Sequence, residues 1–392
     1  MHLTTEEEAL LDSSNPAERK AMHLLVELGE IYGADRLVEI GSAQASGISY
    51  KSIGDPGVQF LESFAEEGAA VSVPTFANPA GMDFDQYDAL GIDDSFAENQ
   101  HRIRDALETM GITLSFTCTP YLAGNLPREG EHVAWAESSA VSFANSVIGA
   151  KTNREGGPSA IAAAITGRTP DHGLHRDENR RPTHRVRVDA TLDSTADIAA
   201  LGSWVGRRVE DGVPYFSGIE AVDTDDLKAL GAAMAASGAV ALYFVEGVTT
   251  DDDPPRGVES LSVGDSEIAD EYDRLRSDAD PDLVVIGCPH ASPAEIADIA
   301  SRVDGESLAA DLWVCTSAAA KAQAERNGHV ATIEAAGGTV LADTCNVVAP
   351  IEAMDYEVTA TDSAKAANYL PGFCEQTVVF DDRASLIEGV IA

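Results

Sequence analysis

Three cysteines occupy the same kind of position in the sequence, at the end of a short apolar run. Cys118 ends ITLSFTC, Cys288 follows DLVVIG, and Cys345 follows GGTVLADT. If each run is a strand, the thiols lie at the carboxyl ends of strands, where open α/β sheets bind their ligands. Three thiolates that meet there can hold a [4Fe–4S] cluster and leave its fourth iron open. An open iron can act as a Lewis acid toward a hydroxyl or a carboxylate.

The cysteines also have a purely structural interpretation. Cysteine is among the residue types most often buried, where it packs as a small hydrophobic side chain. The chain has five cysteines and no CxxC pair, which excludes a local zinc knuckle and argues against a disulfide framework. Spacing alone leaves cluster ligation and core packing open. Core packing is the expectation for Cys374, whereas Cys315 precedes Thr316 and Ser317, which could cap a helix and hold an anion.

Two glycine-containing segments could bind an oxyanion. TNREGGPS, residues 152–159, lets the backbone approach a ligand at Gly156, and Arg154 offers a guanidinium fork to a carboxylate or phosphate. The segment lacks the GxxxxGK[ST] pattern of a phosphate loop, and an ordinary glycine turn explains it equally well. YKSIGDPGVQF, residues 50–60, sets Ser52 among a tyrosine, a lysine and an aspartate, although a plain turn is the commoner explanation.

A carboxylate in an apolar setting is found in EHVAWAESSAV, residues 131–141, at Glu137. A buried carboxylate needs hydrogen-bond partners, and with them it can act as an acid or a base. A hydrogen-bonded structural role for Glu137 is equally consistent with the sequence.

The elements that must position these residues alternate between strand and helix in the second half of the chain. Strands are predicted at RVRVDATL, AVALYFVEGV, DLVVIG, LWVCTS and TVLADTC, and helices at TDDLKALGAAMAASG, SPAEIADIASRV and SAAAKAQAERNGHVATIEAAGG. This order predicts a parallel sheet covered by helices on both faces. The acidic stretch at residues 251–282 interrupts it, and we expect an exposed connection that carries one helix.

The first half has weaker signals. Helices are predicted within residues 5–32 and 96–111, and a strand within residues 69–83. From Cys118 to Gly167, small polar residues alternate with apolar ones, a pattern typical of chain that lines a site. The charged stretch at residues 169–185 is expected to be an exposed boundary between two regions of the chain. We therefore divide the chain into two regions: 1–185, with Cys118 and the TNREGG loop, and 186–392, with Cys288 and Cys345.

Charge and composition narrow the classes of protein. The chain has 392 residues, of which 44% are apolar, and 26 basic against 66 acidic residues give a net charge of −40. Such a surface repels itself in dilute salt and is soluble where salt screens it, which points to the cytosol of a halophile. A nucleic-acid partner is disfavoured because phosphate binding needs clustered basic residues. No apolar run is long enough for a membrane span, and the acidic N-terminus does not resemble a signal peptide, so a cytoplasmic location is expected.

Several stretches resemble the aconitase X family, a divergent branch of the aconitase superfamily: YKSIGDPGVQF, NPAGMD, the segment from CTPYL to REGGPSA, GCPHASPAE and ADTCN. The resemblance covers nearly the whole chain. It implies an aconitase-like, multi-domain α/β catalytic core whose parallel sheets are covered by helices.

The same resemblance bears on the cysteines. IGCPHASPAE resembles an aconitase region whose cysteine binds the cluster, and GGTVLADTCNVVAP resembles the region that supplies the other two ligands as CxxC. Here Cys345 matches the first of those two, and Val348 replaces the second. Cys118 is the natural substitute. The implied cofactor is a [4Fe–4S] cluster held by Cys118, Cys288 and Cys345.

The resemblance also implies a partner. Aconitases bring a catalytic serine over the cluster on a small swivelling domain, and nothing after residue 340 is long enough to be that domain. A separate small subunit is therefore expected to complete a heterodimer, and this chain alone is expected to be inactive. Ser317 is placed at the edge of the substrate. The region around residues 148–157 lacks the Asp-Ser-His group of aconitase, so that acid/base chemistry is not carried over.

Archaeal family members imply a hydro-lyase that dehydrates (R)-5-phosphomevalonate to trans-anhydromevalonate 5-phosphate, a step toward isoprenoids. Glu137 is the candidate proton relay, and the candidate carboxylate and phosphate contacts are Ser52, Thr152, Asn153, Arg154 and Gly156. Three other functions stay open. The substrate could be 3-hydroxyproline or another small hydroxy acid, although such relatives carry an extra fused domain. The chain could be a cluster-bearing sensor or RNA-binding protein, which its acidity disfavours, or a structural subunit with buried thiols.

Overall fold

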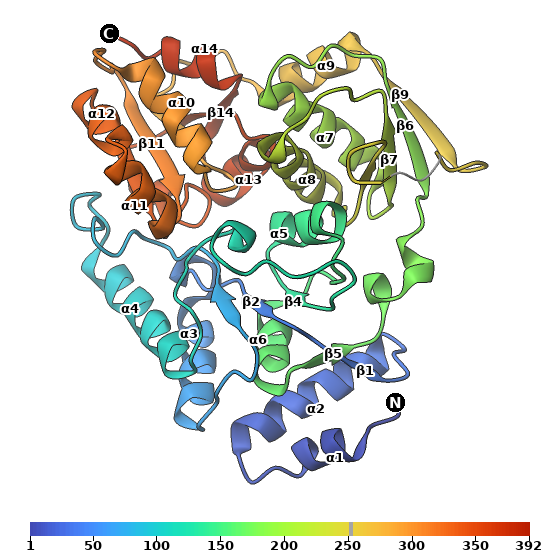
Figure 1. Ribbon diagram of the computed structural model, residues 1–392. Helices are drawn as coiled ribbons and strands as arrows, with labels where there is room; N and C mark the ends of the chain where they lie inside the picture. The colour runs from blue at the N-terminus through green and yellow to red at the C-terminus, as the bar shows by residue number, and fades with distance from the viewer. Residues whose placement is uncertain (251–253) are drawn as a thin grey trace. The chain divides into compact units, whose positions relative to one another are not determined.

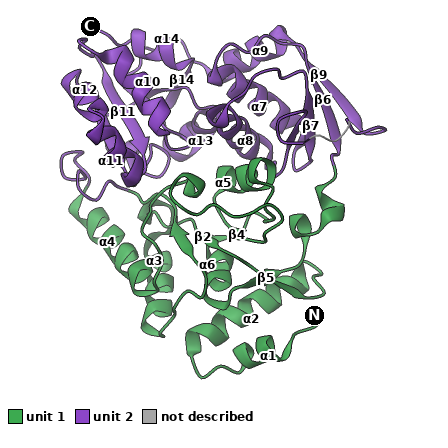
Figure 2. Cartoon of the chain, viewed as in Figure 1, with its two compact units in different colours: residues 1–81, 93–181 green, residues 82–92, 182–392 purple. Residues whose placement is uncertain are grey.

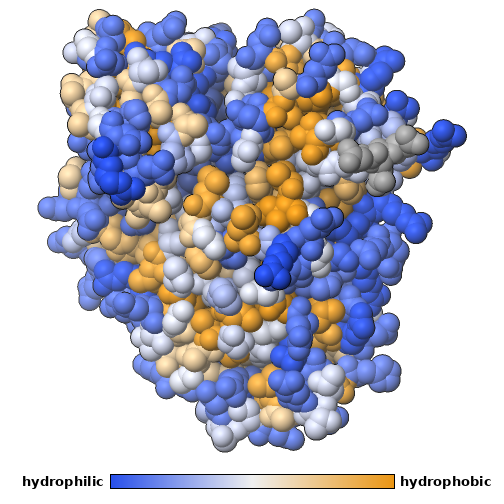
Figure 3. Space-filling model, in the orientation of Figure 1, coloured by the Kyte–Doolittle hydropathy of each residue, from blue (hydrophilic) through white to orange (hydrophobic). Residues whose placement is uncertain are grey.

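The computed structural model describes residues 1–250 and 254–392 and consists of two compact units, which are treated separately below (Figures 1 and 2). Unit 1 comprises residues 1–81 and 93–181, and unit 2 comprises residues 82–92 and 182–392. Hydrophilic residues cover much of the face seen in Figure 3, in keeping with the excess of acidic side chains. Among the described residues, no helix combines the length and apolar character needed to cross a bilayer.

Unit 1 contains short strands packed with helices. Its sheets are a parallel one with the order β3-β2-β4 and an antiparallel pair, β1-β5. In chain order its elements are α1 (Thr5–Leu11), α2 (Pro16–Ile31), β1 (Leu37–Glu39), β2 (Ala43–Ala45), α3 (Tyr50–Glu66), β3 (Thr75–Ala77), α4 (Asp94–Thr109), η1 (Pro120–Leu122), β4 (Ala134–Trp135), α5 (Ser138–Phe143), η2 (Ala144–Ile148), α6 (Gly157–Thr166), β5 (Arg168–Pro170), η3 (Gly173–His175) and η4 (Asp177–Arg180).

Unit 1 differs from the prediction in two places. The apolar pattern at residues 5–32 forms two helices, because Asn15 caps a second start and Pro16 takes its first position. The predicted strand ITLSFTC is wrong: Thr113 forms only an isolated bridge to Phe76, and Phe116 has a φ of 37°, which breaks the extended backbone. Cys118 therefore follows irregular chain rather than a strand.

Unit 2 contains two parallel sheets (Figure 1). The sheet with the order β8-β7-β6-β9 precedes the sheet with the order β12-β11-β10-β13-β14. Its elements are β6 (His184–Val188), α7 (Thr195–Val209), β7 (Pro214–Ser217), α8 (Thr224–Gly238), β8 (Phe244–Val245), β9 (Glu259–Val263), α9 (Asp265–Leu275), β10 (Leu283–Ile286), α10 (Pro293–Val303), β11 (Asp311–Thr316), α11 (Ala318–Arg326), α12 (His329–Ala335), β12 (Thr339–Ala342), η5 (Ile351–Ala353), β13 (Val358–Thr361), α13 (Ala364–Phe373), β14 (Thr377–Phe380) and α14 (Arg383–Glu388).

The five-stranded sheet has the architecture of a doubly wound α/β fold, which confirms the predicted parallel sheet between helices. One face packs on a core formed with α10, α12 and α14, whereas α13 lies outside that core and packs on β13, β14, α7 and α8. The chain runs from β10 outward to β12 and then crosses to β13. The strand order therefore reverses between β10 and β13, the place where such sheets bind ligands.

Three predictions for unit 2 need correction. The helix predicted from residue 317 to 338 is two helices, because Gly328 has a φ of 82° and interrupts it. Only Phe244–Val245 of the predicted strand AVALYFVEGV is a strand. The acidic stretch at 251–282 carries the expected helix, α9, but also β9, which pairs with β6. Residues 251–253 of that stretch lie outside the described residues.

Candidate active site

Two of the three cysteines lie at the same edge of the five-stranded sheet. Cys288 follows β10, Cys345 follows β12, and β11 pairs with both strands. Parallel strands end at the same edge and lie about 4.8 Å apart, so the ends of β10 and β12 are about 10 Å apart. Both cysteine side chains are buried, at 8% exposure each. Cys118, with 6% exposure, belongs to unit 1.

The loop that carries Cys288 is fixed by its backbone. Gly287 has a φ of 114°, and a Cβ there would lie 2.1 Å from the carbonyl oxygen of Cys315, so only glycine fits. The N–H of Ala291 donates to the same Cys315 carbonyl at 2.9 Å. The hydroxyl of Ser363, the N-cap of α13, donates to the carbonyl of Cys288. The thiol is thereby presented from a rigid turn at the point where the strand order reverses.

A histidine connects the two cysteine loops. The imidazole of His290 is fully buried, and its Nε2 lies 2.9 Å from the carbonyl oxygen of Thr344. Because a carbonyl oxygen only accepts, Nε2 carries the hydrogen. His290 stands two residues after Cys288, and Thr344 immediately precedes Cys345. This hydrogen bond therefore sets the spacing of the two thiol-bearing loops.

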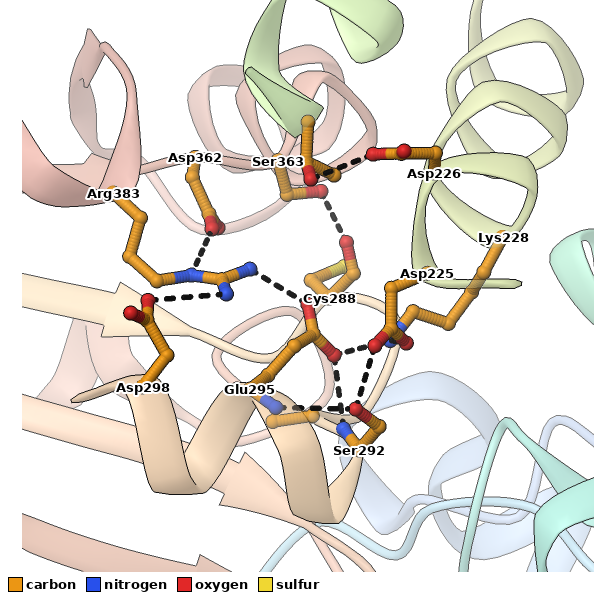
Figure 4. Close-up of polar contacts among 12 residues, drawn as sticks. Asp225, Asp226, Lys228, Cys288, Ser292, Glu295, Asp298, Asp362, Ser363 and Arg383 are labelled. Atoms are coloured by element: carbon orange, nitrogen blue, oxygen red, sulfur yellow. Dashed lines mark hydrogen bonds and ion pairs between the residues drawn. The ribbon is translucent and has the colours of Figure 1, made fainter. Parts of the chain in front are cut away.

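A buried ionic network lies beside the Cys288 loop (Figure 4). Lys228 of α8 contacts Glu295 and donates to Asp225 at 2.8 Å and to the carbonyl of His290 at 3.3 Å. Arg383 donates to Glu295 at 2.6 Å and to Asp362 at 2.9 Å. The network joins α8, α10, α14 and the end of β13 around a cavity of about 20 Å³ that Cys288 also lines.

Local sequence explains one part of the network. Ser292 and Glu295 form the capping box of α10, in which Glu295 N donates to Ser292 Oγ at 3.2 Å and Ser292 N to Glu295 Oε2 at 2.9 Å. The hydroxyl of Ser292 also donates to Asp225 at 2.7 Å. The cap at Ser292 places Glu295 between the two cations.

The network shifts the pKa values of its members in different directions. Burial raises the pKa of Glu295, but the charges of Lys228 and Arg383 outweigh it and bring that pKa to about 2. Burial also raises the pKa of Asp362, and there it prevails: the charge of Glu295 acts in the same direction, and Arg383 and Lys228 oppose it without outweighing it. The pKa of Lys228 is raised: burial lowers it, and Glu295 and Asp225 more than compensate.

Segment 82–92 belongs to unit 2 because it is hydrogen-bonded to the end of β12. Asp83 accepts from Ala342 N at 2.8 Å, and Gln86 Nε2 donates to Val340 O at 3.0 Å. Asp343, the residue directly after the end of β12 at Ala342, has a φ of 65°. Burial, together with the charges of Asp83 and Asp85, raises the pKa of Asp343 to about 7. No sequence signal pointed to this acidic group beside Cys345.

Polar atoms on both sides of Cys345 lack partners. Within the described part of the chain, neither Thr344 Oγ1 nor either amide atom of Asn346 has a hydrogen-bond partner, and these side chains are 1% and 0% exposed. In native proteins, buried polar atoms are nearly always paired with another protein group, an ordered water or a bound group. Buried thiols and open polar atoms at a ligand-binding edge suit an iron–sulfur cluster with a polar substrate. No three His, Cys, Asp or Glu side chains of the described residues form a ready metal site, so the three-cysteine ligand set stays a prediction.

The predicted site residues of unit 1 have structural partners or lie on its surface. Glu137 caps α5, accepting from Ala140 N at 2.7 Å and Ser139 Oγ at 2.6 Å. Thr152 is buried and accepts from Trp135 N at 3.2 Å.

The rest of the TNREGG loop follows the same pattern. Asn153 Oδ1 accepts from Leu174 N at 2.8 Å. Ser52, Arg154 and Gly156 are exposed. In unit 2, Ser317 caps α11, as predicted, with Oγ accepting from Ala320 N at 3.2 Å. The catalytic and substrate-binding roles of these residues stay predictions.

Family models match the chain along most of its length. The aconitase X first domain matches residues 1–178, the second domain residues 182–273, and the third domain residues 281–392. The chain belongs to the aconitase X family. The predicted family and its aconitase-like α/β fold are thus confirmed.

Individual aconitase X relatives match over the full length. A protein of Methanocaldococcus jannaschii named phosphomevalonate dehydratase large subunit is 52% identical over 99% of this chain and 100% of its own. The protein of that name from Methanothermobacter thermautotrophicus is 51% identical over 99% of this chain and 98% of its own. The crystal structure of Thermococcus kodakaraensis aconitase X in its holo form has a TM-score of 0.93 and 46% identity, covering 100% of both chains.

More distant aconitase X relatives carry another name. The cis-3-hydroxy-L-proline dehydratase of Pseudomonas aeruginosa is 34% identical, and the match covers 96% of this chain but 67% of the relative. The part of that relative outside the match agrees with the expectation that hydroxyproline enzymes carry additional sequence.

Proposed function

We propose that this chain is the large, catalytic subunit of a phosphomevalonate dehydratase, a hydro-lyase that converts (R)-5-phosphomevalonate to trans-anhydromevalonate 5-phosphate. Full-length similarity carries the proposal: the archaeal large subunits are 37–52% identical, and the match covers at least 95% of each. The hydroxyproline dehydratases are 30–34% identical, and only 67–68% of their length is matched. We therefore assign this chain the substrate of the archaeal large subunits rather than a hydroxyproline. The reaction serves the mevalonate route to isoprenoids.

The cofactor in this proposal is a [4Fe–4S] cluster with Cys118, Cys288 and Cys345 as ligands. The burial of all three thiols supports it, as do the rigid Cys288 turn and the unsatisfied polar atoms around Cys345. When bound, a cluster with three protein ligands supplies an open iron that polarises the substrate hydroxyl and carboxylate.

The chain's own residues hold and orient the reacting groups. The buried ionic network and His290 keep the Cys288 and Cys345 loops in one geometry, so that little reorganisation is needed on binding. Arg154 and the backbone at Gly156 are our candidates for the substrate phosphate or carboxylate, with Ser52, Thr152 and Asn153. Glu137 is the candidate for moving a proton, and Ser317 for contacting the substrate's edge.

A separate small subunit completes the enzyme in this proposal. The name large subunit given to the relatives supports such a partner. The net charge of −40 supports a salt-rich cytoplasm as the working environment.

Co-expression with the small subunit of a phosphomevalonate dehydratase, anaerobically and in molar KCl, tests the proposal. The pair should remove one water from (R)-5-phosphomevalonate, as read by phosphorus NMR and mass spectrometry. Cis- and trans-3-hydroxyproline serve as control substrates. Dehydration of a hydroxyproline but not of the phosphorylated substrate would overturn the assignment, and each subunit alone should be inactive.

A further inference from the structure

The side chain of Asn346 is enclosed but has no hydrogen-bond partner. It is 0% exposed, and both Nδ2 and Oδ1 are unsatisfied among the described residues. Its backbone is well held: the thiol of Cys374 donates to the Asn346 carbonyl oxygen over 3.6 Å. In the following turn the N–H of Ala349 donates to the Cys345 carbonyl at 2.9 Å. The backbone around Asn346 is therefore hydrogen-bonded, whereas its side-chain amide is not.

Among the described residues, the Asn346 amide makes no hydrogen bond that would explain its burial. Burying an unsatisfied polar atom is unfavourable, whereas an apolar side chain of the same shape at that place costs nothing of the kind. Asn145 shows the ordinary case in this chain: it is 2% exposed, donates to Thr152 O at 2.9 Å and accepts from Thr152 N at 3.0 Å. The contrast between Asn346 and Asn145 points to a partner for Asn346 that arrives with a bound group.

We infer that Asn346 donates a hydrogen bond from Nδ2 to a sulfur atom of the cluster that Cys345 binds. The inference rests on the proposed cluster. Sulfide and thiolate sulfurs accept hydrogen bonds, and Asn346 directly follows Cys345 in the chain. Oδ1 then faces a donor, either a water or the substrate hydroxyl.

The donated hydrogen bond should shift the reduction potential of the cluster in one direction. An N–H dipole pointing at a sulfur stabilises the more negative, reduced cluster, so its removal lowers the reduction potential. A tenfold change in the one-electron equilibrium corresponds to about 59 mV. We expect a fall of about that size, and iron release roughly tenfold faster.

The test compares Asn346→Leu with the matched control Asn145→Leu, first in the cluster-free chain. Removal of an amide without partners should leave the thermal midpoint unchanged or raise it. Removal of the bonded Asn145 amide should lower it. If Asn346→Leu lowers the midpoint as much as Asn145→Leu does, Asn346 is structural and the inference is wrong.

The second comparison uses the chain reconstituted anaerobically with iron and sulfide. A lowered potential and faster iron release in Asn346→Leu, with unchanged stability of the cluster-free chain, supports the inference. A wild-type potential and release rate in Asn346→Leu overturns it and leaves the proposed function intact. A wild-type chain that takes up no cluster overturns both the inference and the proposed cofactor.

Discussion

Glu295→Gln is the most informative perturbation of the buried network, because it removes one charge and preserves shape. Glu295 is 8% exposed and lies between Lys228 and Arg383. Its pKa falls from 4.5 to about 2 on folding. At about 1.4 kcal/mol for each pKa unit, the ionised carboxylate contributes about 3 kcal/mol. Breaking a buried ion pair typically costs about 3–5 kcal/mol, which agrees.

Local amide hydrogen exchange measures this contribution in the cluster-free chain at constant KCl. Peptides that cover α8 and α10 should exchange on the order of a hundredfold faster in Glu295→Gln than in wild type at pH 7. Glu306→Gln is the control, since Glu306 is an exposed acid just beyond α10. Wild-type exchange in α8 and α10 of Glu295→Gln would refute the reasoning.

The same carboxylate predicts a pH dependence. Because its pKa is lower in the folded chain than the ordinary 4.5, its stabilisation is fully present above pH 4.5. It is lost as the pH falls toward 2. The difference in exchange between wild type and Glu295→Gln should therefore shrink across that window. A difference that stays constant from pH 7 to pH 3 would show that charge is not its cause.

Three further substitutions test other parts of the site. His290→Leu should release cluster iron roughly tenfold faster than wild type. His290→Gln keeps a donor toward the Thr344 carbonyl and should release iron at nearly the wild-type rate. Equally fast iron release in both variants would refute the role of His290 in connecting the two cysteine loops. Gly287→Ala should lower the free energy of unfolding, measured by urea titration, by about 3 kcal/mol or more, because the added Cβ would clash with the carbonyl of Cys315 in β11. Gly305→Ala is the control: Gly305 also has a positive φ, 79°, but open space around it, so the loss should be about 1 kcal/mol. Glu137→Gln keeps an oxygen for the α5 cap, so the stability of the chain should change little. Dehydration by the two-subunit enzyme should slow about a hundredfold. Full activity of this variant would refute a proton-relay role for Glu137.

Local chemistry made part of this architecture predictable. Ser292 and Glu295 have the spacing of a capping box and mark the start of α10, and the apolar runs before Cys288 and Cys345 form β10 and β12. These features depend on residues a few positions apart. The strand predicted before Cys118 failed because Phe116 has a positive φ, which interrupts the extended backbone and which strand propensity does not predict.

The connections that hold the site were not predictable, because they join distant positions. His290 and Thr344 are 54 residues apart, and Glu295 and Arg383 are 88 apart. Nothing in the local sequence marks Lys228 as the buried partner of Glu295, since a lysine on a helix is ordinarily exposed. The open amide of Asn346 has no sequence signal, because it depends on how the folded chain encloses the side chain.

Iron and acid-labile sulfide content tests the central claim most directly. The chain is purified anaerobically in molar KCl and reconstituted as wild type, Cys288→Ala and Cys374→Ala. We predict about four irons per chain in wild type and loss of the cluster in Cys288→Ala. Cys374→Ala should also keep its iron but release it faster, because the Cys374 thiol donates to the carbonyl of Asn346 beside Cys345. A folded wild type that stays colourless and iron-free, or a Cys288→Ala variant that keeps its full iron, would contradict the account.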